Sequence, residues 1–169
     1  DILTKLRIRR ELPDLLLDSK EIPELNELSY NPSSGLTVGG AVPLYKLYDH
    51  IDVKKYYQSI VDSTRIIGGI PIQGRATLGG NLCNAAPSAD AIPALIVLGA
   101  TASIHSLNDS REVSINEFCT GPGSTILKNN EIVVSINIPA PKQNSGAHYM
   151  RFIPRNEMDI AVVGVGTSV

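Results

Sequence analysis

The sequence has few cysteines and no arrangement of them that indicates a bonded framework. Only Cys83 and Cys119 occur in 169 residues, far apart and outside any CxxC pair. A disulfide-stapled domain is therefore not expected, and neither is a zinc or iron–sulfur site built by this chain alone. This cysteine usage favours a reducing compartment, and we expect a cytoplasmic protein.

The sequence also lacks an excess of positive charge and any long apolar run. Fifteen basic residues face 17 acidic ones, for a net charge of −2, and the most basic run, Lys5 to Glu11, is short. This balance gives no support for a nucleic-acid face, and a solvated face or an edge strand is expected for that run. No apolar run approaches ~20 residues, and the first residues lack the core of a signal peptide, so no membrane span is expected.

The periodicity of the remaining sequence predicts an α+β fold with mixed or antiparallel pairing and flanking helices. Composition is ordinary for a globular domain, at 43% hydrophobic and 19% charged residues. Helices are expected over residues 43–50, 53–66 and 90–98. Strands are expected in two hairpins, over 28–38 and 102–115, and in three further segments, 131–138, 147–153 and 160–169.

A glycine-rich stretch, IIGGIPIQGRATLGGNLCNAAPSAD (Ile66 to Asp90), is the most informative feature. Five glycines fall within thirteen positions, although glycine loses more backbone entropy on folding than any other residue. A P-loop is excluded, because Arg75 and Ala76 stand where Lys and a hydroxyl residue are needed. No Rossmann GxGxxG is present either.

Two interpretations of this stretch stay open on the residues alone. Backbone N–H groups at Gly79 and Gly80, with the Thr77 hydroxyl, could bind a pyrophosphate because no Cβ blocks the approach. Asn81 could fix the loop, and Asp90 could accept from a ribose hydroxyl. The other interpretation is a glycine-rich turn with no ligand.

No other residues suggest catalysis or metal binding. His50, His105 and His148 have no partner spacing, so each is expected to be structural or exposed. Cys83 is expected to be a small buried residue beside the glycine loop. We predict no catalytic acid, base or metal ligand in this chain.

The motifs around the glycines resemble those of the FAD-binding subunit of the molybdenum hydroxylases, which include xanthine, carbon monoxide and aldehyde dehydrogenases. The family carries an ATxGGN segment, an N-(A/S)-x-P-x-x-D segment and an apolar helix ending in LGA. Here these stand at 76–81, 84–90 and 95–100. The later segments NNEIVVSINIP (129–139) and HYMRFIPRNEMDIAVVGVG (148–166) are similar to the family's next two motifs, in the same order.

The resemblance implies the second lobe of a two-lobed FAD-binding domain shared with vanillyl-alcohol-oxidase-type flavoenzymes. Residues 1–169 would form one FAD-binding domain. The family's first phosphate loop, A-G-G-T-D-L, would have ended at Asp1 and Ile2, and its C-terminal domain would follow Val169. We therefore expect a fragment.

The resemblance also implies which residues meet the cofactor. The residues expected at the pyrophosphate are Thr77, Gly79, Gly80 and Asn81. Asp90 is expected at ribityl or ribose hydroxyls. The residues expected beside the isoalloxazine, or on the strand at the ring or the adenine end, are Ile67, Gly68, Ile132 and Val133.

Arg151 stands where many family members have Lys, and a cation there would stabilise the reduced anionic flavin. The alternative is a surface ion pair with Glu157 or Asp159. Arg155 and Asp159 are expected to fix the turn between the last two strands.

The implied function is an electron-transfer flavoprotein subunit that binds FAD noncovalently. Electrons would come from [2Fe–2S] clusters on a small subunit, beside a large molybdenum subunit, and leave to an external acceptor. Two alternatives remain: a stand-alone oxidase of the vanillyl-alcohol-oxidase type with covalent flavin, and a non-catalytic scaffold that has lost the cofactor.

Overall fold

A five-stranded antiparallel sheet forms the base of the molecule in the computed structural model, which describes residues 2–8, 13–156 and 158–169. In spatial order its strands are β1 (Leu28–Asn31), β2 (Gly35–Gly39), β7 (Ile132–Ile138), β3 (Thr101–His105) and β4 (Ser110–Ser114). Two of the pairs are the expected hairpins, β1–β2 and β3–β4, and β7 lies between them.

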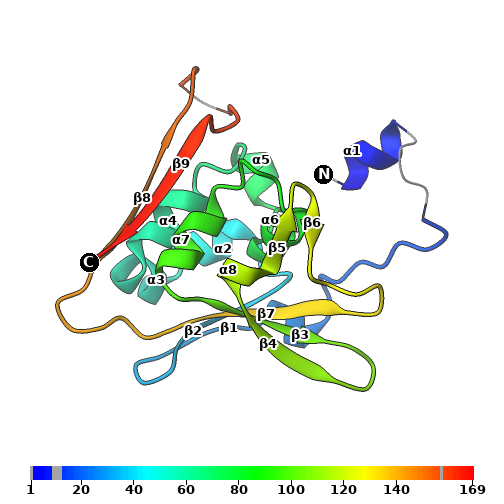
Figure 1. Cartoon of the computed structure of the whole chain (residues 1–169), viewed down its shortest axis with the longest axis horizontal. Coiled ribbons are helices and arrows are strands. Elements are labelled where there is room, and N and C mark those ends of the chain that lie inside the picture. Colours follow the sequence, from blue (N-terminus) through cyan, green and yellow to red (C-terminus); the bar gives the residue numbers. More distant parts are fainter. Residues whose placement is uncertain (1, 9–12, 157) are drawn as a thin grey trace.

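Helices cover one face of this sheet (Figure 1). They are α2 (Leu44–Asp49), α3 (Ile51–Tyr56), α4 (Gln58–Thr64), α5 (Ile70–Gln73), α6 (Leu78–Asn84), α7 (Ala91–Val97) and α8 (Ile115–Phe118). Before them come α1 (Ile2–Arg7) and the short 3-10 helix η1 (Pro23–Asn26). The basic run therefore begins within a helix and not a strand; its residues 9–12 lie outside the described part of the chain.

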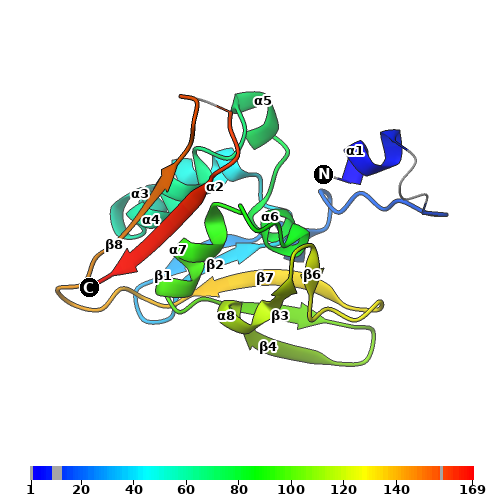
Figure 2. The same ribbon diagram turned by 45° about the horizontal axis from the view of Figure 1, so that its top comes forward.

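A separate antiparallel hairpin, β8 (Ala147–Phe152) with β9 (Val163–Ser168), lies on the far side of the helices (Figures 1 and 2). Strand β8 packs on α4 and β9 on α7. The approach is close, because a Cβ on Gly166 would lie 2.6 Å from the Pro93 carbonyl oxygen. A small hairpin, β5 (Cys119–Gly121) with β6 (Ser124–Thr125), stands beside α6 and α8. The α+β class with an antiparallel sheet and flanking helices is thus confirmed.

The core lies between the sheet and the helices. Strand alternation sends Ala102 and Ile104 of β3, and Ile136 and Ile138 of β7, into this layer, where all four are buried. Their neighbours on the opposite face of the sheet, such as Thr101 and Ser103, are polar and half-buried. One face of the sheet is buried and the other faces solvent, which explains why apolar and polar residues alternate along these strands.

The helix expected over 53–66 is two helices, α3 and α4, and the single-helix prediction is wrong. Tyr57 breaks it with φ −130° and ψ 54°, values outside the helical region. Its side chain is buried, and its hydroxyl donates to the Pro139 carbonyl oxygen at 3.0 Å. The break turns the first helix away and lets α4 pack on β8.

Candidate functional site

The ATLGGNL segment forms the start of helix α6 and not an irregular bend. Thr77 is its N-cap, and its Oγ1 accepts a hydrogen bond from the Gly80 N–H at 2.9 Å. The Asn81 N–H donates to the Thr77 carbonyl oxygen at 3.0 Å. Two of the groups expected to face a pyrophosphate therefore also stabilise the first turn of the helix.

Gly79 is buried against the main chain of Gly40, just after β2. A Cβ on Gly79 would lie 2.6 Å from the Gly40 carbonyl oxygen, and a Cβ on Gly40 would lie 2.6 Å from the Val133 carbonyl oxygen of β7. Three backbones thus meet without side chains between them, which sets α6 directly on the sheet. The space beside the Gly79 Cα is filled by protein, so the absence of a Cβ serves the packing of α6 on the sheet. A contact of the Gly79 N–H with a pyrophosphate stays a prediction.

Asn81, one turn into α6, carries an unpaired polar group. Its Oδ1 is buried and has no hydrogen-bond partner among the described residues, although the residue as a whole is half-buried. An unpaired buried oxygen costs about 1–3 kcal/mol. A turn of the amide about its terminal bond exchanges its oxygen and nitrogen, so the group can offer a donor or an acceptor to a ligand.

Asp90 and Arg151 form a buried ion pair between the start of α7 and β8. The Arg151 guanidinium donates to Asp90 Oδ2 at 3.0 Å, and the two side chains are 9% and 10% exposed. The alternative of a surface pair with Asp159 is wrong, because Asp159 bonds to Arg155 as expected for the turn. Glu157 lies outside the described residues.

Tyr149 completes this buried group, and nothing in the spacing of the sequence indicated it. Its hydroxyl donates to Asp90 Oδ1 at 2.8 Å, while the residue is only 3% exposed. Burial raises the pKa of Tyr149 well above its ordinary value, and the hydrogen bond to Asp90 raises it further. The phenol therefore keeps its proton and holds one carboxylate oxygen while Arg151 holds the other.

Ile67 and Gly68 lie in a tight turn between α4 and α5. Gly68 has φ +60°, which favours glycine, and a Cβ there would lie 2.9 Å from the Ile72 side chain. Buried Gln73 holds this turn, since its Nε2 donates to the Arg65 and Ile67 carbonyl oxygens at 2.6 and 3.3 Å. Gln73 is a second supporting residue that the sequence analysis missed.

Ile132 and Val133, at the start of β7, point to opposite faces. The Ile132 side chain is exposed and that of Val133 belongs to the core. The Val133 side chain is therefore closed to a ligand, whereas the Ile132 side chain is about half exposed. Just before them, Glu131 pairs with Arg111 at 2.9 Å.

The remaining predictions concern cysteine and histidine. Cys83 is exposed, so the prediction of a buried residue is wrong. The histidines are structural or exposed, as expected: His50 caps α3, while the exposed His105 contacts Ser103 and the exposed His148 pairs with Asp62 at 2.8 Å.

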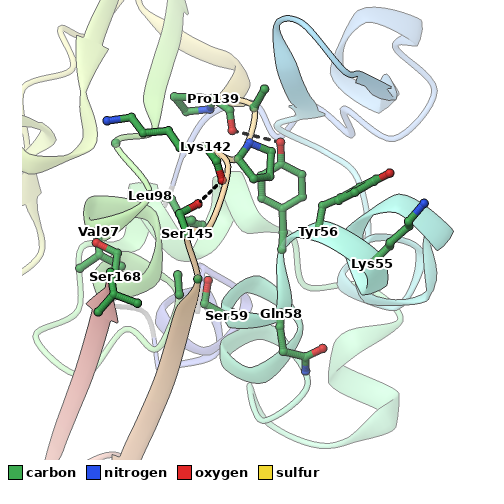
Figure 3. Close-up of a pocket in the computed structure, with 17 residues that line it drawn as sticks. Lys55, Tyr56, Gln58, Ser59, Val97, Leu98, Pro139, Lys142, Ser145 and Ser168 are labelled. Atoms are coloured by element: carbon green, nitrogen blue, oxygen red, sulfur yellow. Dashed lines mark hydrogen bonds between the residues drawn. The ribbon is translucent and has the colours of Figure 1, made fainter.

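Cavities lie at the surface of the helical layer, and two of them bear on the site. The larger, of about 610 Å³, is lined by the α3–α4 junction, the end of α7 and the segment 139–147 (Figure 3). It contains none of the predicted cofactor residues. The smaller, of about 410 Å³, lies between the α6–α7 turn and β5, and it contains none of the predicted cofactor residues either, although Ala89 and Ile92 of its lining are near Asp90 in the sequence. The candidate site therefore comprises the start of α6 and the Asp90–Arg151 pair.

No helix in the described part of the chain is long and apolar enough to cross a membrane.

Known proteins are similar to this chain in sequence. The xanthine dehydrogenase FAD-binding subunit of Escherichia coli O157:H7 is 30% identical over 165 residues, which cover 97% of this chain and 56% of that protein. The nicotinate dehydrogenase FAD-subunit of Eubacterium barkeri is 23% identical over 172 residues, or 100% of this chain and 58% of that protein. The chain thus spans about half the length of these relatives.

Solved structures of related proteins have the same fold as this chain. A chain of the carbon monoxide dehydrogenase from Hydrogenophaga pseudoflava superimposes with a TM-score of 0.90 at 25% identity, over 96% of this chain and 56% of that one. A chain of quinoline 2-oxidoreductase from Pseudomonas putida 86 gives 0.89 at 28% identity, with the same coverage. The family described as the FAD binding domain in molybdopterin dehydrogenase matches residues 1–141. The chain therefore belongs to the FAD-binding domains of the molybdopterin dehydrogenases.

Proposed function

We propose that this chain, over residues 1–169, is the FAD-binding domain of a flavoprotein subunit in a molybdenum hydroxylase complex. Membership of the FAD-binding family over most of the chain carries this proposal. The named relatives are FAD subunits of xanthine and nicotinate dehydrogenases. FAD would supply the redox chemistry, receiving electrons from [2Fe–2S] clusters on a small partner and passing them to an external acceptor. A large partner would hold the molybdenum cofactor, and the complex would work in the cytoplasm.

The residues at the start of α6 suit a dinucleotide. Gly80 is exposed in the first turn and Thr77 keeps a hydroxyl proton to donate, so both can meet a pyrophosphate beside Gly79 and Asn81. The unpaired Asn81 amide offers a further bond. The Asp90 carboxylate uses one lone pair on each oxygen for Tyr149 and Arg151, which leaves capacity for a ribityl or ribose hydroxyl.

The remaining proposed contacts belong to the ring and the adenine end. Ile67 and Gly68 would lie beside the isoalloxazine, with the turn held by Gln73. Ile132 would contact the cofactor through its exposed side chain and Val133 through its main chain. Arg151 would lie near the N1–C2=O edge of the flavin. No side chain of this chain is assigned as an acid or base toward the organic substrate; its residues bind and orient the cofactor.

Purification of the full-length protein tests this function. A yellow protein whose flavin is released by acid, and which co-purifies with iron–sulfur and molybdenum subunits, is the expected result. Flavin that stays on the acid precipitate would instead show a covalent oxidase of the vanillyl-alcohol-oxidase type. A colourless protein that takes up no added FAD would show a scaffold domain and overturn the proposal.

A further inference from the structure

The Asp90–Arg151 pair has a consequence for the charge that this site presents. A lone arginine beside a flavin offers a full positive charge, which favours the reduced anionic form. Here the guanidinium lies 3.0 Å from a carboxylate, and both side chains are about nine-tenths buried. Buried pairs are poorly screened by solvent, so the two charges act together on their surroundings.

No other described charge lies in this group. Tyr149 binds the free side of Asp90 with a neutral hydroxyl, and burial keeps that hydroxyl protonated. Asp159, the described acidic residue of the hairpin turn, pairs with Arg155. The set of Asp90, Tyr149 and Arg151 is therefore neutral as a whole, with both carboxylate oxygens fixed in place.

We propose that Asp90 masks the positive charge of Arg151, so that the site offers a neutral, fixed dipole and not a cation to the flavin. This rests on the proposed function, since it requires FAD beside Arg151. Asp90 then has a role beyond bonding a cofactor hydroxyl: it limits how far the site favours reduced over oxidised FAD. Tyr149 acts as a positioning residue that keeps the carboxylate against the arginine.

The test uses charge variants of the full-length apoprotein and measures the dissociation constants of each for oxidised and for chemically reduced FAD. The ratio of the first constant to the second is the preference for reduced FAD. Asp90→Asn unmasks Arg151, so the preference for reduced FAD should rise, on the order of tenfold for one uncompensated charge nearby. Arg151→Gln leaves a lone carboxylate and should lower the preference. The double variant restores neutrality and should return within about threefold of the parent value.

The sign of the change in FAD preference distinguishes charge masking from a purely structural role of the pair. Each single variant leaves one buried group without its partner, so both should lower thermal stability whatever the role of the pair. Only charge masking predicts opposite shifts in FAD preference that cancel in the double variant. Should Asp90→Asn fail to fold, Asp90→Ser, which also removes the negative charge, takes its place and should raise the preference for reduced FAD in the same direction.

A control pair of charges lies away from the proposed site. The exposed pair Asp49–Lys54, with an N–O distance of 2.7 Å, provides matched charge variants on α2 and α3 that should leave the preference unchanged. Shifts of the same sign in both single variants, or no shift, would overturn charge masking while the flavoprotein assignment stands. A full-length protein that binds neither form of FAD would overturn the proposed function itself.

Discussion

Gly79 of α6 lies so close to Gly40 that a Cβ on Gly79 would stand 2.6 Å from the Gly40 carbonyl oxygen and 2.8 Å from its Cα. Contacts this short are not seen for real side chains, and the obstacle is backbone, which cannot rotate away. The contact fixes the start of the proposed cofactor-binding helix relative to β2 and β7.

Gly79→Ala should therefore destabilise the chain, by about 1–3 kcal/mol for overpacking at a site that cannot relax freely. Gly74→Ala is the matched control within the same glycine-rich stretch. Gly74 has helical φ and ψ, and a Cβ there meets only ordinary contacts at 3.7 Å or beyond. It should be neutral or stabilising by up to about 1 kcal/mol. Urea unfolding midpoints compare the two; equal effects would refute the Gly40 contact.

Thr77→Ala should cost about 1 kcal/mol of stability even without any cofactor, because it removes the cap that accepts from Gly80 N–H. Thr77→Ser keeps the oxygen and should recover most of the loss. Thermal unfolding of the cofactor-free protein measures this. A Thr77→Ala variant that is as stable as the parent, yet binds FAD more weakly, would show that the hydroxyl serves only the ligand.

Tyr149→Phe should destabilise the chain by about 1–3 kcal/mol, since it removes a donor from the buried carboxylate of Asp90 and leaves that oxygen unpaired. Tyr45→Phe is the comparison variant. Tyr45 is exposed, and its hydroxyl has no hydrogen bond to the described residues. Denaturant unfolding with an unchanged slope would attribute the difference to the folded state.

Glu131 should make stability depend on pH below neutrality. The hydrogen bond from Arg111, helped by the Lys128 N–H, lowers the pKa of Glu131 from its ordinary value of 4.5 to about 2. A pKa lowered by folding gives stability that is complete above pH 4.5 and is lost as the pH falls toward 2. Unfolding of the parent and of Glu131→Gln should therefore converge over that window.

Arg111→Gln should remove the same pH dependence from the other side of the pair, because the bidentate contact supplies most of the shift. A gap between the parent and either variant that stays constant from pH 4.5 to pH 2 would contradict this assignment.

Local sequence patterns were sufficient to predict most strands of the sheet and to predict the family. Both hairpins were predicted because turn residues such as those of NPSSG stand between alternating strands, and the structure has them at β1–β2 and β3–β4. The order of short motifs around ATLGGN was enough to predict the family. These signals are local in the sequence, so a single sequence holds them.

Contacts between distant segments were not predictable in this way. The explanation of Gly79 requires Gly40, which lies just after β2, and no periodicity links the two. The partner of Arg151 is Asp90, 61 residues away, and not the acidic residues nearby. Tyr57, where the helix breaks, is buried and bonds to Pro139, 82 residues on. Tertiary contacts such as these override local propensity.

The β8–β9 hairpin shares no backbone hydrogen bond with the five-stranded sheet among the described residues, and it is held through its contacts with α4 and α7. Its attachment to the rest of the molecule therefore runs through side chains, including the buried Tyr149. Since Tyr149 and Arg151 reach from this hairpin to Asp90, we expect FAD bound at the proposed site to slow the opening of the hairpin. Deuterium uptake at the amides of β8 and β9 should then fall when FAD is added.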